Sequence, residues 1–108
     1  MAYKAIHRFA KISPQKARLV ANLVRGKFAD EALEILRFQP QRGARMLEKV
    51  IRSAMANAAE AGEMEPEGLY IRDVRVDEGP RFKRLRPRSR GMANIILKRM
   101  SHISVELE

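Results

Sequence analysis

Apolar side chains recur at helical spacing through the first sixty residues and predict three helices. The first helix follows Ser13-Pro14, where serine suits the N-cap and proline the first helical position. Its apolar residues include Ala17, Val20 and Val24, which share one face of a helix. Gly26 stands where a residue in the left-handed conformation would end that helix.

The second helix is expected to begin near Asp30, to direct Leu33 and Leu36 inward, and to end before Pro40. A longer helix from Gln41 to Ala61 has the clearest pattern, ended by a glycine. Its apolar residues recur every three or four positions, and they are Ala44, Leu47, Ile51, Ala54, Met55 and Ala58.

Three other segments read as strands, because they are rich in β-branched and aromatic residues. They are Tyr3 to Ile12, Leu69 to Glu78, and Ile95 to Leu107. The last two are neighbours in the chain and predict an antiparallel hairpin. In the third strand one face would carry Ile95, Leu97, Ile103, Val105 and Leu107, and the other Lys98, His102 and Glu106. The fold class is therefore α+β, with three helices packed on a small antiparallel sheet in a single domain, residues 1–108.

Positive and negative residues are segregated along the chain, a feature that the net charge of +9 does not reveal. Residues 1–29 carry seven Lys or Arg and no acid, and residues 79–104 carry eight and no acid. Residues 30–78 are slightly acidic. This predicts that the two basic blocks share a face toward a polyanion. The candidate RNA-binding residues are therefore Lys4, Arg8, Lys11, Lys16, Arg18, Arg25, Lys27, Arg81, Lys83, Arg84, Arg86, Arg88, Arg90, Lys98 and Arg99.

The segment between the last two strands is the strongest functional signal. Six of the ten residues from Arg81 to Arg90 are basic, and Phe82 and Leu85 are its only large apolar groups. Such a segment cannot bury itself against its own domain, and its like charges repel. RNA would neutralise it, since arginine binds phosphates in bidentate fashion and stacks on bases. The alternative is a solvated basic loop.

Other chemistry finds little support. There is no cysteine, and His7 and His102 are the only histidines, so neither a metal site nor an acid–base pair is expected. Asp73, Asp77 and Glu78 are expected to pair with Arg72 and Arg75. We therefore expect no cofactor and no enzymatic activity. No apolar run is long enough to cross a bilayer, and the first residues do not resemble a signal peptide, so the expected location is the cytoplasm.

The motifs together resemble the bacterial type of the large-subunit ribosomal protein L twenty-two family. The resemblance is carried by Ser13-Pro14-Gln15-Lys16-Ala17-Arg18-Leu19-Val20, Leu23-Val24-Arg25-Gly26-Lys27, Ser53-Ala54-Met55-Ala56-Asn57-Ala58, Asp77-Glu78-Gly79-Pro80, Lys83-Arg84, Pro87-Arg88, Gly91, Ile96-Leu97-Lys98-Arg99 and Ser101-His102-Ile103. These motifs occur in order along nearly the whole chain. After Gly91 the family commonly has a basic residue, whereas this chain has Met92.

That resemblance implies a three-stranded sheet, three helices and a long protruding β-hairpin with its tip at residues 79–92. It also implies a structural role in the large ribosomal subunit, with rRNA and neighbouring ribosomal proteins as partners. The hairpin would thread rRNA, support assembly and reach the wall of the exit tunnel, near the nascent polypeptide. The residues placed there are Phe82, Lys83, Arg84, Pro87 and Arg88, and changes at the first three would alter macrolide sensitivity.

Three other functions stay open from the residues alone. A free-standing regulatory module that binds RNA or DNA would have the same charge pattern. A small nuclease would need catalytic groups, for which only His7 and His102 are candidates. Binding to a membrane surface would need a basic amphipathic helix, but the most amphipathic helix lies in the acidic middle of the chain.

Overall fold

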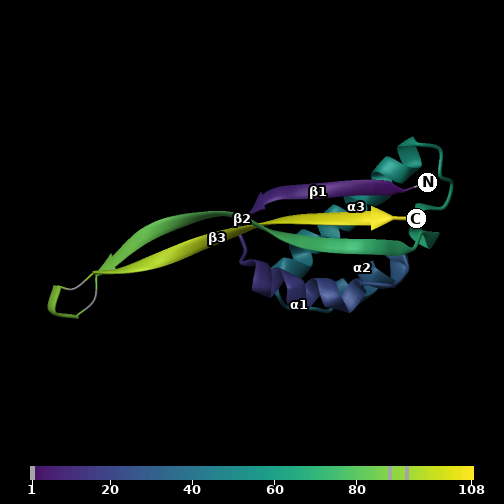
Figure 1. Ribbon diagram of the computed structural model, residues 1–108. Helices are drawn as coiled ribbons and strands as arrows, with labels where there is room; N and C mark the ends of the chain where they lie inside the picture. The colour runs from purple at the N-terminus through teal and green to yellow at the C-terminus, as the bar shows by residue number, and fades with distance from the viewer. Residues whose placement is uncertain (1, 88, 92) are drawn as a thin grey trace.

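The computed structural model describes the backbone of residues 2–87, 89–91 and 93–108, and the side chains of residues 2–85, 90–91 and 96–108. Within these residues the chain forms three strands, three α-helices and two short 3-10 turns (Figure 1). In chain order these elements are β1 (Tyr3–Ala10), α1 (Pro14–Val24), α2 (Ala29–Arg37), α3 (Arg42–Glu60), η1 (Pro66–Gly68), β2 (Ile71–Pro87), η2 (Ser89–Gly91) and β3 (Ala93–Leu107).

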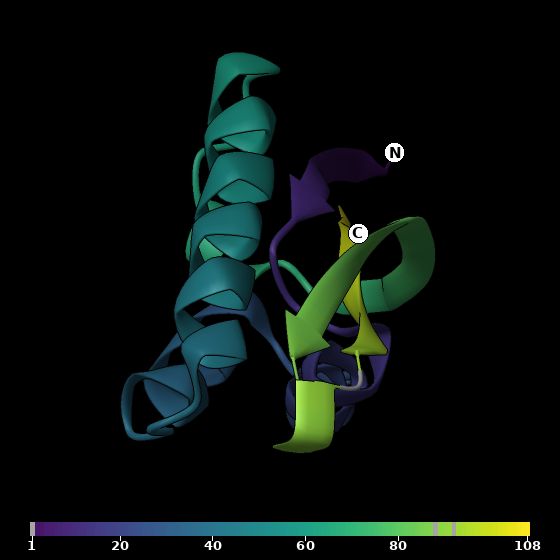
Figure 2. The ribbon, with the colours of Figure 1, turned by 90° about the vertical axis from the view of Figure 1, so that its left-hand side faces the viewer.

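The described strands form one antiparallel sheet in the order β1-β3-β2. The last strand, β3, therefore lies in the middle of the sheet. Between β1 and β2 the chain forms the three helices, which cover one face of the sheet. Figure 2 shows α3 standing beside the strands. This arrangement confirms the α+β class and the three-stranded sheet with a long hairpin.

The core lies between the helices and the sheet. From β3 it takes Ile103, Val105 and Leu107, each at most 1% exposed, as the alternation predicted. The helices supply the other side, and the largest of their fully or almost fully buried side chains are Leu36, Leu47, Ile51, Val20 and Val24. Among the described side chains, β2 and β3 contribute to this core only from their body halves.

The helix bounds agree with the prediction to within about two residues. Ser13 is the N-cap of α1 and Pro14 the first helical residue, although the serine hydroxyl does not cap the helix. Gly26 and Gly62 follow the ends of α1 and α3 with φ of +82° and +101°. Glycine is favoured at both places because a Cβ is strained in this left-handed conformation.

The predicted end of the second strand at Glu78 is wrong. Strand β2 begins at Ile71 rather than Leu69 and continues to Pro87, and β3 begins at Ala93 rather than Ile95. The pairing runs outward from Arg81 with Arg99 to Pro87 with Ala93. Backbone hydrogen bonds join two strands whatever side chains they carry. The basic residues of this segment show no apolar alternation, so the sequence did not predict that the strands continue through it.

A bulge marks the place where the hairpin leaves the body. Glu78 pairs with Ser101 and Arg81 with Arg99, so β2 has one more residue than β3 in this interval. Gly79 lies against β3 here, and a Cβ on it would be 3.1 Å from the carbonyl carbon and oxygen of Met100. The bulge thus depends on a residue without a side chain.

The hairpin makes the molecule long. Its principal extents are 62 × 25 × 16 Å and its radius of gyration is 16.7 Å. A compact domain of this length would have a radius of about 13 Å. In Figure 1 the hairpin extends from one end of the body, and both chain termini lie at the other end. The seven residues from Arg81 to Pro87 alone span roughly 20 Å at the rise of a strand.

We predict that Gly79→Ala lowers the free energy of unfolding by about 1–2 kcal/mol, because the new methyl group would press on the Met100 backbone. The midpoint of thermal unfolding should fall by about 5–10 °C. The matched control is Gly68→Ala, since nothing lies within 4 Å of a Cβ there. Equal midpoints for the two variants would contradict this account of the bulge.

Candidate nucleic-acid interface

The extended hairpin carries cations on both faces. Because side chains alternate along a strand, Arg99 and Leu97 share the face of the buried Ser101, and their partners there are Arg81 and Lys83. On the opposite face the pairing places Phe82 beside Lys98. Both faces are therefore positively charged, and neither is covered by the body's core.

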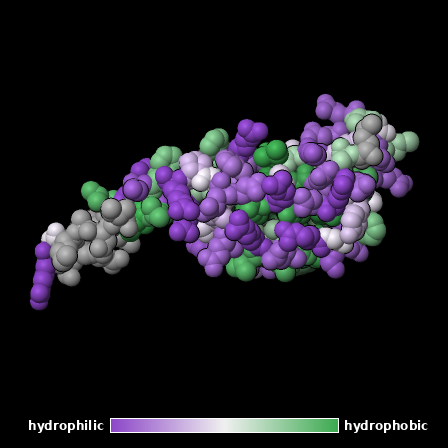
Figure 3. Space-filling view, viewed as in Figure 1, coloured by the Kyte–Doolittle hydropathy of each residue, from purple (hydrophilic) through white to green (hydrophobic). Residues whose placement is uncertain are grey.

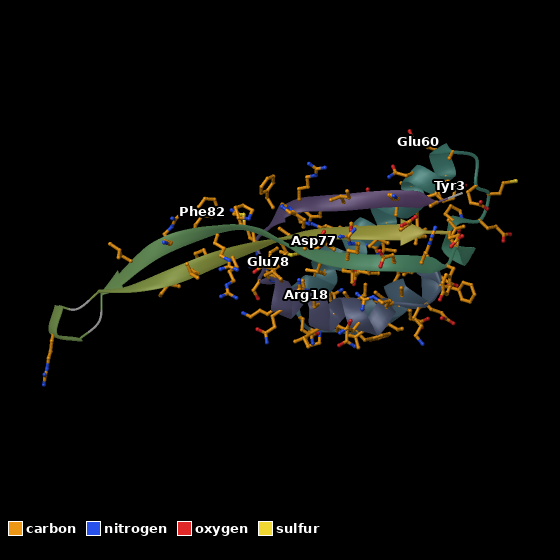
Figure 4. All side chains as sticks on the ribbon, viewed as in Figure 1. Tyr3, Arg18, Glu60, Asp77, Glu78 and Phe82 are labelled. Carbon is orange, nitrogen blue, oxygen red and sulfur yellow. The ribbon has the colours of Figure 1, made fainter. Side chains whose placement is uncertain are left out.

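Phe82 and Arg84 form a cation–π pair on the face that points away from the helices. The guanidinium carbon of Arg84 lies 5.5 Å from the centre of the Phe82 ring. Phe82 is 41% exposed, and Figure 4 shows it on the hairpin beyond the body. An exposed aromatic ring with a guanidinium above it is a surface on which a nucleic-acid base can stack.

A groove of about 550 Å³ lies at the base of the hairpin, between the hairpin and the N-terminal ends of α1 and α3. We call it the junction groove. Five basic residues line it, and they are Lys11, Lys16, Arg42, Lys98 and Arg99, of which Lys98 borders it from the opposite face of β3. None of the described lining residues is acidic. The structure thus brings residues of the two basic blocks together, as the charge pattern predicted.

Close packing shapes the junction groove. Gly43 on α3 is buried, and a Cβ on it would be 3.0 Å from Cδ1 of Ile12 and 3.5 Å from Cγ2 of Val20. A larger residue would push α3 away from α1. The two helices therefore meet with their N-terminal ends at the groove, where the partial positive charge of each helix adds to that of the side chains.

Two of the predicted RNA-binding arginines, Arg18 and Arg25, connect α1 and its C-terminal end to β2 by hydrogen bonds. Strand β2 is at an edge of the sheet, and its carbonyl groups accept from α1. Arg18 donates to the Val76 oxygen at 3.0 Å, and Arg25 donates to the Val74 oxygen at 2.7 Å. Figure 4 shows Arg18 on α1 below the sheet. These bonds satisfy an edge that would otherwise be open to another strand. Whether either arginine also contacts RNA stays a prediction.

Three other predicted residues lie apart from the junction groove. Lys4 is near Asp73, Arg75 and Glu106, and Arg8 is near Arg75 and Asp77, so their surroundings have mixed charge. Lys27 lies beside Glu31 and Glu34. In Figure 3 hydrophilic residues cover most of the visible face of the body. A polyanion would meet a less favourable field at these places than at the groove.

Glu78 is an acid at the base of the hairpin. Its carboxylate accepts a hydrogen bond of 2.8 Å from Arg81, which holds its pKa below the usual value of 4.5, with weaker contributions from Arg99 and Arg18. Glu78 lies where the hairpin meets the body (Figure 4). It stays ionised at neutral pH and occupies part of the Arg81 guanidinium, which a phosphate would otherwise take.

The remaining acids and the histidines give no catalytic arrangement. Arg75 pairs with Asp77 at 3.5 Å, as expected, but Arg72 pairs with Glu106 and Glu108 rather than with a neighbour on β2. His102 accepts a hydrogen bond from the Phe9 amide through Nδ1 at 3.1 Å. Among the described residues no cluster could hold a metal ion, and none of the described helices is long and apolar enough to cross a membrane.

The tip is described in part. Arg90 is exposed and has φ of +63°, followed by Gly91 at +72°, so the chain reverses through two left-handed residues. Arg88 and Met92 lie outside the described residues, as do the side chains of Arg86 and Pro87. Their predicted contacts therefore stay predictions.

Comparison with known proteins decides the family. The family model described as ribosomal protein L22p/L17e matches residues 5–108. The chain belongs to this family. It is 60% identical to the large ribosomal subunit protein uL22 of Rhodopirellula baltica over 97% of its own length and 92% of that protein. It is 48% identical to uL22 of Desulfotalea psychrophila, over 100% of its own length and 98% of that protein. With uL22 of Thermotoga sp. it shares 52% identity, over 94% of its own length and 64% of that protein.

Membership confirms the resemblance read from the motifs. Proteins of the L22p/L17e family are structural components of the large ribosomal subunit and not enzymes, so the expected lack of catalytic activity and the cytoplasmic, ribosomal location are confirmed. One cation of the junction groove was missed. Arg42 lies in the part of the chain with a net acidic balance, and counting charges by helix end rather than by block would have found it.

We predict that Arg25→Ala and Arg18→Ala each lower the free energy of unfolding by about 1–2 kcal/mol, since each leaves an edge carbonyl of β2 without its charged donor. Urea unfolding measures this directly. Lys16→Ala is the matched control, because it removes an exposed cation from the same helix. If all three variants unfold at the same urea concentration, the two arginines do not stabilise the edge.

Proposed function

We propose that this constituent of the large ribosomal subunit binds rRNA through its basic hairpin and the junction groove. The main support for this proposal is the structure and charge of the hairpin. Its strands stay paired beyond the core, and no acid occurs between Gly79 and Ser104, so that apart from the pair of Arg81 with Glu78 its sequence offers no acid to balance its cations. A soluble protein gains nothing from such an arm in water, because like charges repel and an uncovered two-stranded ribbon is only marginally stable.

Folded RNA supplies what the hairpin lacks. Phosphates on both sides of an inserted ribbon would neutralise both of its faces, and arginine forms paired hydrogen bonds with phosphate oxygens. Phe82 and Arg84 add a stacking surface for exposed bases. Binding would be largely electrostatic and would release counterions, so affinity should fall steeply with salt. By joining RNA segments on its two faces, the hairpin would also support subunit assembly.

The length of the hairpin fits a further role at its tip. An arm that extends roughly 20 Å past the body can pass through a layer of RNA and expose its end on the far side. We propose that this end reaches the wall of the exit tunnel, with Pro87 and Arg88 nearest to the nascent polypeptide and with Phe82, Lys83 and Arg84 further back along the arm, where they pair with Lys98, Leu97 and Ile96. Substitutions at Phe82, Lys83 and Arg84 would then change sensitivity to macrolides. The body would contact neighbouring ribosomal proteins.

We predict that replacing Arg81, Lys83 and Arg84 together by glutamine weakens binding to a bacterial large-subunit rRNA transcript. The slope of log affinity against log salt should fall by about 2–3, since each lost phosphate contact contributes roughly 0.7–0.9. Filter binding across a salt series measures the slope.

The control for this experiment changes the net charge by the same amount on the body. Arg37, Lys49 and Arg52 are exposed cations of α2 and α3, and their replacement by glutamine should leave the slope nearly unchanged. Equal losses of slope in the two triple variants would mean that net charge alone drives binding. The hairpin would then have no special part in it.

A further inference from the structure

The junction groove has an apolar floor that phosphate binding does not explain. Ile12, Leu19 and Leu97 line it together with the five cations. Leu19 is 66% exposed and Leu97 is 37% exposed, although they come from α1 and β3, far apart in the chain. Exposed leucines facing one cationic groove mark a binding site rather than an ordinary polar surface.

We infer that the junction groove binds one unstacked nucleotide of RNA. Its base lies against Leu19 and Leu97, and its flanking phosphates contact Lys16, Arg42 and Arg99. This inference rests on the proposed binding of rRNA and adds to it a defined pocket and the kind of nucleotide that occupies it.

The size and charge of the groove fit this occupant. Its volume of about 550 Å³ is within the usual range of pockets that hold small ligands. Five cations without an acid among the described lining residues match a polyanion, and the uncovered leucines match the flat apolar face of a base. Duplex RNA would not present such a face, because its bases are stacked within the helix.

Two polar side chains at the rim could contact the edge of a base. Ser13 and Gln41 are the N-cap residues of α1 and α3, and both line the groove. Neither makes the usual capping hydrogen bond with its own helix. Their hydroxyl and amide groups are therefore available to a ligand, and the helix ends are available to phosphate. An acidic peptide would neutralise the cations but has no flat surface to cover the leucines.

The test compares two leucines of α1. Leu19→Ser should weaken binding of the full chain to a bacterial large-subunit rRNA transcript about fivefold, the loss expected when roughly 40 Å² of apolar contact with the base is removed. The salt slope should not change, since no cation is removed. Leu23→Ser is the matched control, because Leu23 is 40% exposed on the same helix but does not line the groove. It should leave the affinity unchanged.

A second readout detects the base directly. The chain has no tryptophan, so Leu19→Trp introduces a single tryptophan at the groove, whose fluorescence can be excited selectively over that of Tyr3 and Tyr70. The rRNA transcript should quench its fluorescence by stacking and should leave that of Leu23→Trp nearly unchanged. Quenching of both, or of neither, would overturn the inference. So would quenching of the Leu19→Trp variant by an oligoglutamate peptide but not by RNA.

The outcomes separate this inference from the proposed function. If the unaltered chain binds rRNA with a steep salt dependence while Leu19→Ser and Leu23→Ser bind equally well, the nucleotide pocket is wrong and rRNA binding stands. If the unaltered chain does not bind rRNA, both proposals fail. A loss of affinity in Leu19→Ser that is accompanied by a loss of salt slope also overturns the pocket, because it would indicate lost phosphate contacts.

Discussion

The backbone pairing of β2 with β3 is the constraint on which the rest of the structure depends. In the body this ladder is supported by a core of Val74, Ile103 and Val105. Beyond the bulge at Gly79 the backbone pairing continues to Pro87 and Ala93, although the side chains of residues 81–85 and 97–99 are exposed. The same two strands therefore serve as part of a stable domain at one end and as an uncovered basic arm at the other. The arm obtains its direction from the body, while its stability depends on what neutralises it.

The body is built to hold that ladder in place. Since β2 is an edge strand, two of its carbonyls accept hydrogen bonds from Arg18 on α1 and from Arg25 at the C-cap of that helix. The contact at Gly43 then brings the start of α3 against α1, which leaves the junction groove beside the root of the hairpin. Cations far apart in the sequence meet there because β3, which carries Lys98 and Arg99, runs back into the middle of the sheet next to β1. The interface is thus a consequence of the topology as much as of the composition.

The sequence predicted the helices well because their apolar spacing and their terminal glycines act locally. It placed the end of β2 at Glu78, nine residues too early, since a strand held by its backbone alone has no apolar alternation to detect. The charge blocks predicted that the two basic ends share a face, and in the structure Lys11 and Lys16 line one groove with Lys98 and Arg99. They could not separate these from Arg18 and Arg25, whose bonds to β2 depend on how α1 packs. Leu19 and Leu97 were counted as ordinary apolar positions, because only the three-dimensional fold leaves them exposed in one groove.

Hydrogen exchange tests most directly whether RNA stabilises the arm. The amides to compare are those of residues 81–85 and 96–99 in the free protein and in assembled large subunits. The account predicts fast exchange in the free protein, since the arm buries little apolar surface, and strong protection in the subunit. Residues 74–76 and 103–105 of the core should be protected in both states. Equal protection of the arm in the two states would contradict the claim that rRNA supplies the stability that its own side chains do not.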